Sequence, residues 1–305
     1  MPWLDETFGI GELARLTGVP VRTIRFYCDE GIVDSVRSTG GHRRFDRAAV
    51  ERLELVRRLR GLGLGLTAVR QVLVGERSLA EVVAAERASL DVRLAELAWR
   101  RACLRAVEEA APADRAARLG LLAAVENGAA AREALIGFWR RTIVAPVSAE
   151  MFDAFVAIAV PEPTADPTPS QVVAFAELFA LAGDRDLTRL LLAMARTNAE
   201  LIADEGELLA GIGEACALAE PLVRAGEPPR AGPALDRFVA AHASARRTRD
   251  TPRFRGRLLS WVAADRDPRM RRYWRLVVEA GAAPVTIGAT HMWLTDSLQL
   301  SAGRG

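Results

Sequence analysis

Residues 10–27 have the sequence IGELARLTGVPVRTIRFY, which predicts two short helices joined by a tight turn. The first half of this stretch carries apolar residues at the spacing of one helix face. Gly18 allows a sharp turn, because glycine adopts positive φ at little cost. Pro20 suits the start of the next helix, because the N–H that proline lacks would be unpaired there. The second helix is expected over residues 21–30, and the pair predicts a helix-turn-helix motif.

A candidate β-hairpin follows directly on the two helices. Residues 32–33 begin an extended segment, the Gly-Gly dipeptide at 40–41 is typical of a hairpin turn, and residues 42–45 (HRRF) return from it. A hairpin that presents arginines directly after a helix-turn-helix is a wing. Asp46 is then suited to cap the next helix. These features predict a winged helix-turn-helix DNA-binding domain over residues 1–75.

In order and spacing, these segments resemble the DNA-binding domain of the MerR family of transcription regulators. The resemblance runs over about residues 8–74 and includes GHRRF at 41–45 and RRLRGLG at 57–63. It implies that the helix at 21–27 lies in the major groove of double-stranded promoter DNA. It also implies a homodimer on a pseudo-palindromic operator. Such a dimer distorts the spacer DNA, so that RNA polymerase can engage both promoter elements.

The candidate DNA-binding residues lie on the second helix and on the wing. Arg22 and Arg25 are three residues apart on one helix face, so both guanidinium groups can reach DNA together. The family resemblance implies that Arg25 and Tyr27 contact DNA and that Arg43 contacts phosphates. Phe26 stands where many family members have tyrosine, and it supplies no hydroxyl. The complete predicted set is Arg22, Thr23, Arg25, Phe26, Tyr27, His42, Arg43 and Arg44.

A long helix is predicted from Leu79 to about Glu109, where the sequence contains neither glycine nor proline. Its leucines repeat at alternating steps of four and three residues, which is a heptad seam. Such a seam could be the edge of a bundle, whereas the family resemblance implies an antiparallel dimerisation coiled coil over 76–111. Arg101 within the seam suggests a salt bridge or a packed stem with its charge in water. The predicted dimerisation residues are Val83, Leu90, Leu94, Leu97, Arg101 and Leu104.

Residues 112–305 predict an all-α effector domain, because no alternating strand pattern there exceeds four residues. The fold class expected for the whole chain is therefore mainly α, with a winged helix-turn-helix domain, a long antiparallel coiled-coil dimerisation helix and an all-α effector domain. Helices are expected in this last domain at 128–144, 148–159, 170–183, 186–204, 206–225, 234–247, 254–265, 267–281 and 289–300.

Charge and cysteine content exclude several function classes. All 41 basic residues are arginine and they face 39 acidic residues, so any nucleic-acid interface must be local; the first 75 residues hold 12 arginines against 9 acids. Three scattered cysteines form no disulfide framework or metal motif. GxSxG, P-loop, GxGxxG and HExxH motifs are all missing, so we expect no catalysis, cofactor or metal. Without a signal peptide or membrane-length apolar run, we expect a cytoplasmic protein without a membrane partner.

An effector site is predicted within the helical domain, because apolar pockets with a few polar groups are where regulators hold small molecules. The candidate residues, which could equally be core residues, are Trp139, Trp261, Trp274, His291 and Trp293. The alternative is a ligand-independent, DNA-anchored protein whose helical domain docks a protein partner. The stretch 237–275 holds 12 arginines against three acids. A solvated face, an anion site, extra phosphate contacts and a docking surface stay open for it.

Overall fold

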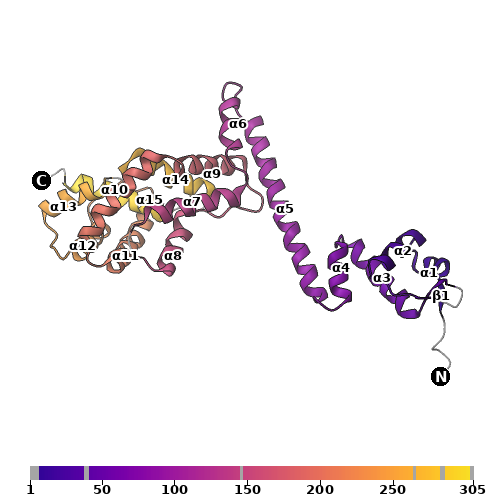
Figure 1. The fold of residues 1–305 in the computed structure, drawn as a ribbon. Coiled ribbons are helices and arrows are strands. Elements are labelled where there is room, and N and C mark those ends of the chain that lie inside the picture. The colour runs from indigo at the N-terminus through magenta and orange to yellow at the C-terminus, as the bar shows by residue number, and fades with distance from the viewer. Residues whose placement is uncertain (1–6, 38–40, 145–146, 264–265, 282–285, 303–305) are drawn as a thin grey trace. The chain divides into compact units, whose positions relative to one another are not determined.

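The structure, a computed structural model, describes residues 7–37, 41–144, 147–263, 266–281 and 286–302 (Figure 1). The predicted mainly α fold class is confirmed. Contacts divide the chain into two compact units, Met1–Arg93 and Leu94–Gly305. The boundary falls inside the long helix α5 (Leu79–Glu108), whose predicted extent is correct to one residue. Within the described residues, no helix is long and apolar enough to cross a membrane.

The helix-turn-helix of the first unit consists of α1 (Ile10–Thr17) and α2 (Val21–Asp29). The turn between them needs glycine at Gly18, where φ is 69°. A Cβ there would also lie 3.3 Å from Nη1 of Arg57, so both the backbone and the available space favour glycine. The conformation of this turn thus sets the angle between the two short helices.

A small antiparallel sheet forms the wing, with strand order β1-β3-β2. Its strands are β1 (Phe8–Gly9), β2 (Val36–Arg37) and β3 (Arg43–Phe45). Phe8 pairs with Phe45, and Val36 pairs with Arg44. The predicted turn residue Gly40 lies outside the described residues. The sequence did not predict β1, because two residues carry no alternating pattern.

Two further helices complete the fold before α5, namely α3 (Arg47–Gly61) and α4 (Leu66–Leu73). As the sequence predicted, Asp46 caps α3: its carboxylate accepts the N–H of Ala49 at 2.8 Å. The core of this unit is apolar, and the side chains buried in it include Leu13, Ile24, Ile32, Phe45, Leu53 and Val69. Because Ile24 is buried in this core, α2 turns its opposite face outward.

The second unit is entirely helical over its described residues. Its helices after α5 are α6 (Arg115–Ala123), α7 (Gly128–Thr142), α8 (Ala149–Ala159), α9 (Pro169–Ala182), α10 (Arg185–Leu201), α11 (Glu205–Arg224), α12 (Pro233–Ser244), α13 (Pro252–Trp261), α14 (Pro268–Gly281) and α15 (Ile287–Ala302). The nine helices predicted from residue 128 onward all exist, with described ends within a few residues of those expected. The sequence prediction gave no range for α6, a nine-residue helix that Gly120 interrupts with a weak helix former.

Two hydrophobic clusters organise the second unit. The first holds Trp99 of α5, Phe138, Phe175 and Tyr273, and the ring centroids of Trp99 and Phe175 are 5.7 Å apart. Here α9 packs against α7 and α14. The second cluster is centred on Phe238 and includes residues of α11, α12, α13 and α15. One face of α5 is therefore part of the core of the helical unit.

Candidate nucleic-acid interface

The outward face of α2 carries the two predicted groove-binding arginines. Arg22 and Arg25 are both exposed, whereas Ile24 between them is fully buried. Neither guanidinium group has an ion-pair partner among the described residues. Phe26 is 48% exposed, and Thr23 and Tyr27 are half-buried at the edges of the same face. The helix thus presents two uncompensated cations and an aromatic ring to solvent.

The wing arginines are engaged within the protein. Nη2 of Arg43 donates to Oδ1 of Asp29 at 2.8 Å, which joins β3 to the end of α2. The hydrogen bond to that carboxylate raises the pKa of Arg43. Arg44 donates from Nε to the hydroxyl of Thr7 at 3.1 Å and from Nη2 to the Thr7 carbonyl at 2.5 Å. Because a guanidinium group has five N–H donors, both side chains keep donors for a phosphate.

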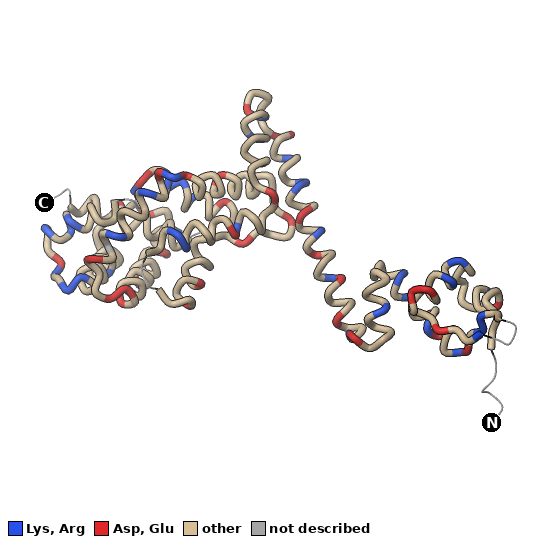
Figure 2. The backbone as a smooth tube through the Cα atoms, viewed as in Figure 1, with Lys and Arg blue, Asp and Glu red and all other residues tan. Residues whose placement is uncertain are grey.

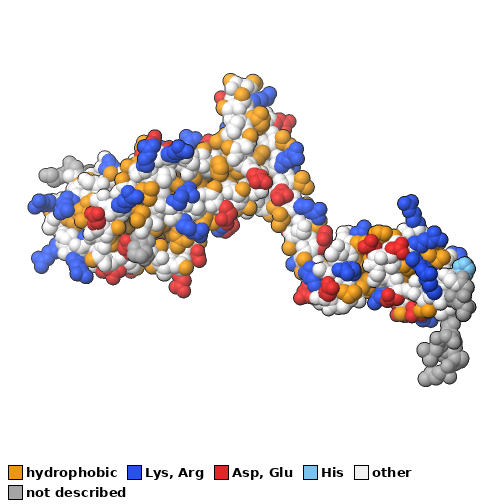
Figure 3. Space-filling view, in the orientation of Figure 1, with side chains coloured by type: hydrophobic (Ala, Val, Ile, Leu, Met, Phe, Trp, Pro, Cys, Tyr) orange, Lys and Arg blue, Asp and Glu red, His pale blue; other side chains and the backbone are white. Residues whose placement is uncertain are grey.

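The ion pair between Arg43 and Asp29 places the arginine-bearing strand β3 next to the end of α2. His42 is exposed at the start of β3, and the side chains of Arg43 and Arg44 are only half-buried. Figure 3 shows arginine side chains gathered on the visible face of this unit. A helix with free arginines beside an arginine-bearing hairpin suits a groove flanked by phosphates.

Comparison with known proteins matches this part of the chain to one family. Residues 8–76 match the family described as MerR HTH family regulatory protein. Residues 8–76 form a MerR-family helix-turn-helix domain. The domain-level resemblance predicted from the sequence is thereby confirmed.

Relatives of the MerR domain are named as regulators or nodulation proteins. Nodulation protein NolA of Bradyrhizobium elkanii is 43% identical over 91 residues, which is 29% of this chain and 42% of NolA. HTH-type transcriptional regulator HmrR of Rhizobium leguminosarum bv. viciae is 36% identical over 84 residues, or 28% of this chain and 60% of HmrR. HTH-type transcriptional regulator ZntR of Escherichia coli K12 is 36% identical over 67 residues, which is 22% of this chain and 48% of ZntR.

These likenesses cover a limited part of each protein. The chain spans less than two thirds of the length of each of these relatives. The family match ends at residue 76, shortly before α5 begins. No solved structure matches the chain. The role of everything after the MerR domain must therefore be argued from its own residues.

The predicted dimerisation residues lie on one side of α5. The apolar ones are all exposed, and they are Val83, Leu90, Leu94, Leu97 and Leu104. Hydrophobic side chains are visible along this helix in Figure 3. The opposite side carries Trp99, which is buried in the core of the helical unit. Arg101 of the predicted seam pairs within the chain, with Asp166 at 2.5 Å.

The five residues predicted to line one effector pocket do not come together. Trp139 and Trp274 are stacked in the first cluster, with centroids 5.9 Å apart. Trp261 and Trp293 belong to the second cluster, and His291 contacts Phe238 there at 5.5 Å between ring centroids. The expectation of one shared pocket is therefore wrong. Sequence spacing places an aromatic residue on a helix face but does not show which of two cores that face enters.

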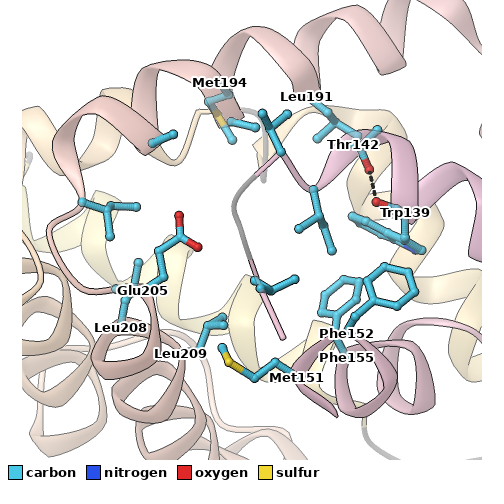
Figure 4. A pocket seen from close by; sticks show the side chains of 16 residues that line it. Trp139, Thr142, Met151, Phe152, Phe155, Leu191, Met194, Glu205, Leu208 and Leu209 are labelled. Carbon is cyan, nitrogen blue, oxygen red and sulfur yellow. Dashed lines mark hydrogen bonds between the residues drawn. The ribbon is translucent and has the colours of Figure 1, made fainter. Parts of the chain in front are cut away.

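The helical unit contains a cavity of about 290 Å³ between α7, α8, α10 and α11 (Figure 4). Of the five predicted residues, only Trp139 lines it. The wall is formed by α7, α8, α10 and α11 and is almost wholly apolar. Its larger side chains are Trp139, Met151, Phe152, Phe155, Leu191, Met194, Glu205, Leu208 and Leu209. Sequence reasoning missed this grouping because helices far apart in the chain supply it.

In the described part of the chain, five of the twelve arginines in the stretch 237–275 form ion pairs with acids inside or outside it, namely Arg237, Arg255, Arg269, Arg271 and Arg272. Arg255 pairs with Asp236 at 3.1 Å and with Asp250 at 2.6 Å. Arg272 pairs with Glu177 at 2.7 Å. Figure 2 shows arginines and acids interleaved along the helices of this unit. Among the described residues, no three His, Cys, Asp or Glu side chains are placed to hold a metal ion.

Proposed function

We propose that the protein is a transcription regulator that binds a pseudo-palindromic promoter operator as a homodimer. The observation that carries this proposal is the outward face of α2, where Arg22 and Arg25 are exposed and uncompensated beside the wing. In a MerR-type domain this helix enters the major groove, and the two arginines contact base edges or phosphates there. Arg43 and Arg44 of the wing approach the flanking backbone.

The exposed stripe of α5 supports the homodimer. Leucines at heptad spacing are exposed on this helix, and an antiparallel α5 from a second copy would cover them. Two copies present two reading helices, so the dimer contacts two operator half-sites. The free energy of binding is then roughly twice that of one domain.

Control of transcription follows from the shape of the bound DNA. The dimer distorts the spacer between the two promoter elements, and RNA polymerase then engages both of them. A small molecule bound in the helical unit controls the outcome only if it binds one dimer geometry more tightly than the other. The protein acts without catalysis, cofactor or metal and without a membrane partner.

A nuclease footprint on the DNA upstream of the protein's own gene tests this function. We expect a protected pseudo-palindrome with hypersensitive bonds at its centre, and protection that weakens as salt rises because phosphate contacts release counterions. Arg25→Ala should lower operator affinity by about tenfold or more, through lost charge-assisted hydrogen bonds.

Arg196→Ala is the matched control, because it removes an exposed arginine of α10 outside the MerR domain. It should leave the footprint unchanged. Equal affinities for Arg25→Ala and the unmodified protein would contradict the assignment of α2 as the reading helix. A footprint without central hypersensitivity would contradict the distortion.

A further inference from the structure

The aromatic end of the cavity in the helical unit is rigidly held. The indole N–H of Trp139 donates to the hydroxyl of Tyr273 at 2.7 Å, and that hydroxyl donates to the carbonyl of Ala159 at 2.8 Å. The ring of Phe155 meets Trp139 edge-on, with centroids 4.9 Å apart. The N–H of Trp139 is therefore already used, and the indole offers a ligand only its ring.

One polar group of the cavity is left without a partner. The hydroxyl of Thr142 donates to the carbonyl oxygens of Phe138 at 3.1 Å and Trp139 at 3.2 Å. The carboxylate of Glu205, by contrast, has no hydrogen-bond or ion-pair partner among the described residues. Figure 4 shows it directed into the cavity from the side opposite Trp139, Phe152 and Phe155.

This carboxylate lies in the first turn of α11, where a negative charge is favourable, but it does not cap the helix. Asp204, not Glu205, caps α11: its Oδ1 accepts the N–H of Glu207 at 2.8 Å. Burial raises the pKa of Glu205, so its charged form is held in an unfavourable, partly desolvated setting. Other acids of the same unit are paired with arginines, for example Glu214 with Arg237 at 2.7 Å. Glu205 has no such charged partner among the described residues, and only the N-terminal end of α11 offers it a positive potential.

We propose that this cavity binds a small organic amine in its cationic form. The ammonium group contacts the carboxylate of Glu205, and the hydrocarbon or aromatic body lies against Trp139 and Phe152. Contact with the aromatic rings removes the apolar body from water, and a charge-assisted hydrogen bond to the carboxylate fixes the orientation. Flexible thioethers of Met151 and Met194 adapt the wall to the ligand's shape. An anion is repelled, and a neutral ligand leaves Glu205 uncompensated.

If the protein is the proposed regulator, the amine is its effector, and this part of the inference rests on the proposed function. The binding site itself is argued only from residues of the helical unit. A cavity of about 290 Å³ suits a small molecule rather than a polypeptide segment. The chemistry of the site can therefore be tested without DNA.

Three matched probes test the site by calorimetry with the full chain at neutral pH. They are 4-phenylbutylamine, 4-phenylbutanol and 4-phenylbutyrate, which share one body and differ in charge. The amine should bind at least about tenfold more tightly than the alcohol, and the carboxylate should bind most weakly. Glu205→Gln should reduce the affinity for the amine to that for the alcohol and leave the alcohol unchanged. That unchanged affinity also shows that the variant is folded.

Glu150→Gln is the control, because Glu150 is an exposed acid next to Met151 that does not line the cavity. It should keep the preference for the amine. Equal binding of amine and alcohol, no amine binding at millimolar concentration, or a preference that survives Glu205→Gln would each overturn the proposal, whether or not the protein binds its operator. Glu205-dependent amine binding that leaves the footprint unchanged would support the site and contradict effector control.

Discussion

The carboxylate of Asp29, at the end of α2, positions the wing. Arg43 donates to it from β3, and both side chains are partly exposed. Exposed ion pairs contribute little to stability, so the main effect of this one is on geometry. It holds the returning strand of the hairpin against the helix that carries Arg22 and Arg25. In the proposed complex, the wing and the reading helix thus approach DNA as one surface.

Helical spacing was enough to predict that Arg22 and Arg25 share one face. It could not predict the pairing of Arg43 with Asp29, because these residues are brought together only when the hairpin folds back. Glu205 was missed as a candidate for the same reason. A lone acid at a helix start is normally solvated, and only the packing of other helices encloses this one.

The titration of Glu205 should be measurable as a change in stability. Because burial raises its pKa, the folded state keeps its proton to a higher pH than the unfolded chain does. Stability is therefore lost as pH rises from the usual pKa of glutamic acid through the raised one, and it stays lost above that value. Glutamine does not titrate. The stability of Glu205→Gln relative to the unmodified protein should rise between about pH 4 and about pH 7.

Urea unfolding at both pH values measures this difference. A stability difference for Glu205→Gln that does not change with pH would show that Glu205 is not penalised by burial.

At the scale of elements, the spacing of apolar residues predicted where the helices lie, but it did not predict which helices pack against each other. Helices α7 to α15 each have a clear apolar face or a start and stop signal, so each of them could be predicted from its own sequence. Nothing local indicates that α9 packs on α14 while α11 packs on α12 and α15. These pairings depend on shape complementarity between faces that are distant in sequence. The cavity is a product of such pairings, and it was therefore not predicted.

The contact between α14 and α15 depends on one glycine. A Cβ at Gly288 would lie 2.1 Å from Cε3 of Trp274, whose ring is buried and stacked on Trp139. Because the ring has no free space into which to move, Gly288→Ala should destabilise the protein by roughly 1–3 kcal/mol in urea unfolding.

Gly256→Ala is the matched control within α13. A Cβ at Gly256 meets nothing within 4 Å. Alanine is the better helix former, so this variant should be neutral or more stable by up to about 1 kcal/mol. Equal effects of the two substitutions would mean that helix propensity, rather than the close approach of α15 to Trp274, governs the response.

At the scale of the whole molecule, α5 has two faces with different roles. Trp99 on one face belongs to the same hydrophobic cluster as Trp139, which lines the cavity. The other face carries the exposed leucines of the proposed dimer seam. A ligand that repacks the first cluster would therefore act on the helix that joins two copies in the proposed dimer. In the proposed regulator, this helix would connect effector binding with dimer geometry, as effector control requires.

The dimer seam can be tested at Leu97, which is 62% exposed on α5. Leu97→Asp removes no contact from the core of one chain, so the fold should be kept. In the antiparallel pair, however, it places a carboxylate in the apolar seam. We expect dimers to dissociate in sedimentation experiments and operator affinity to fall with them, because one chain reads one half-site. Leu300→Asp, at a 49% exposed leucine of α15, should leave both properties unchanged. A dimer that survives Leu97→Asp must be held together by another surface.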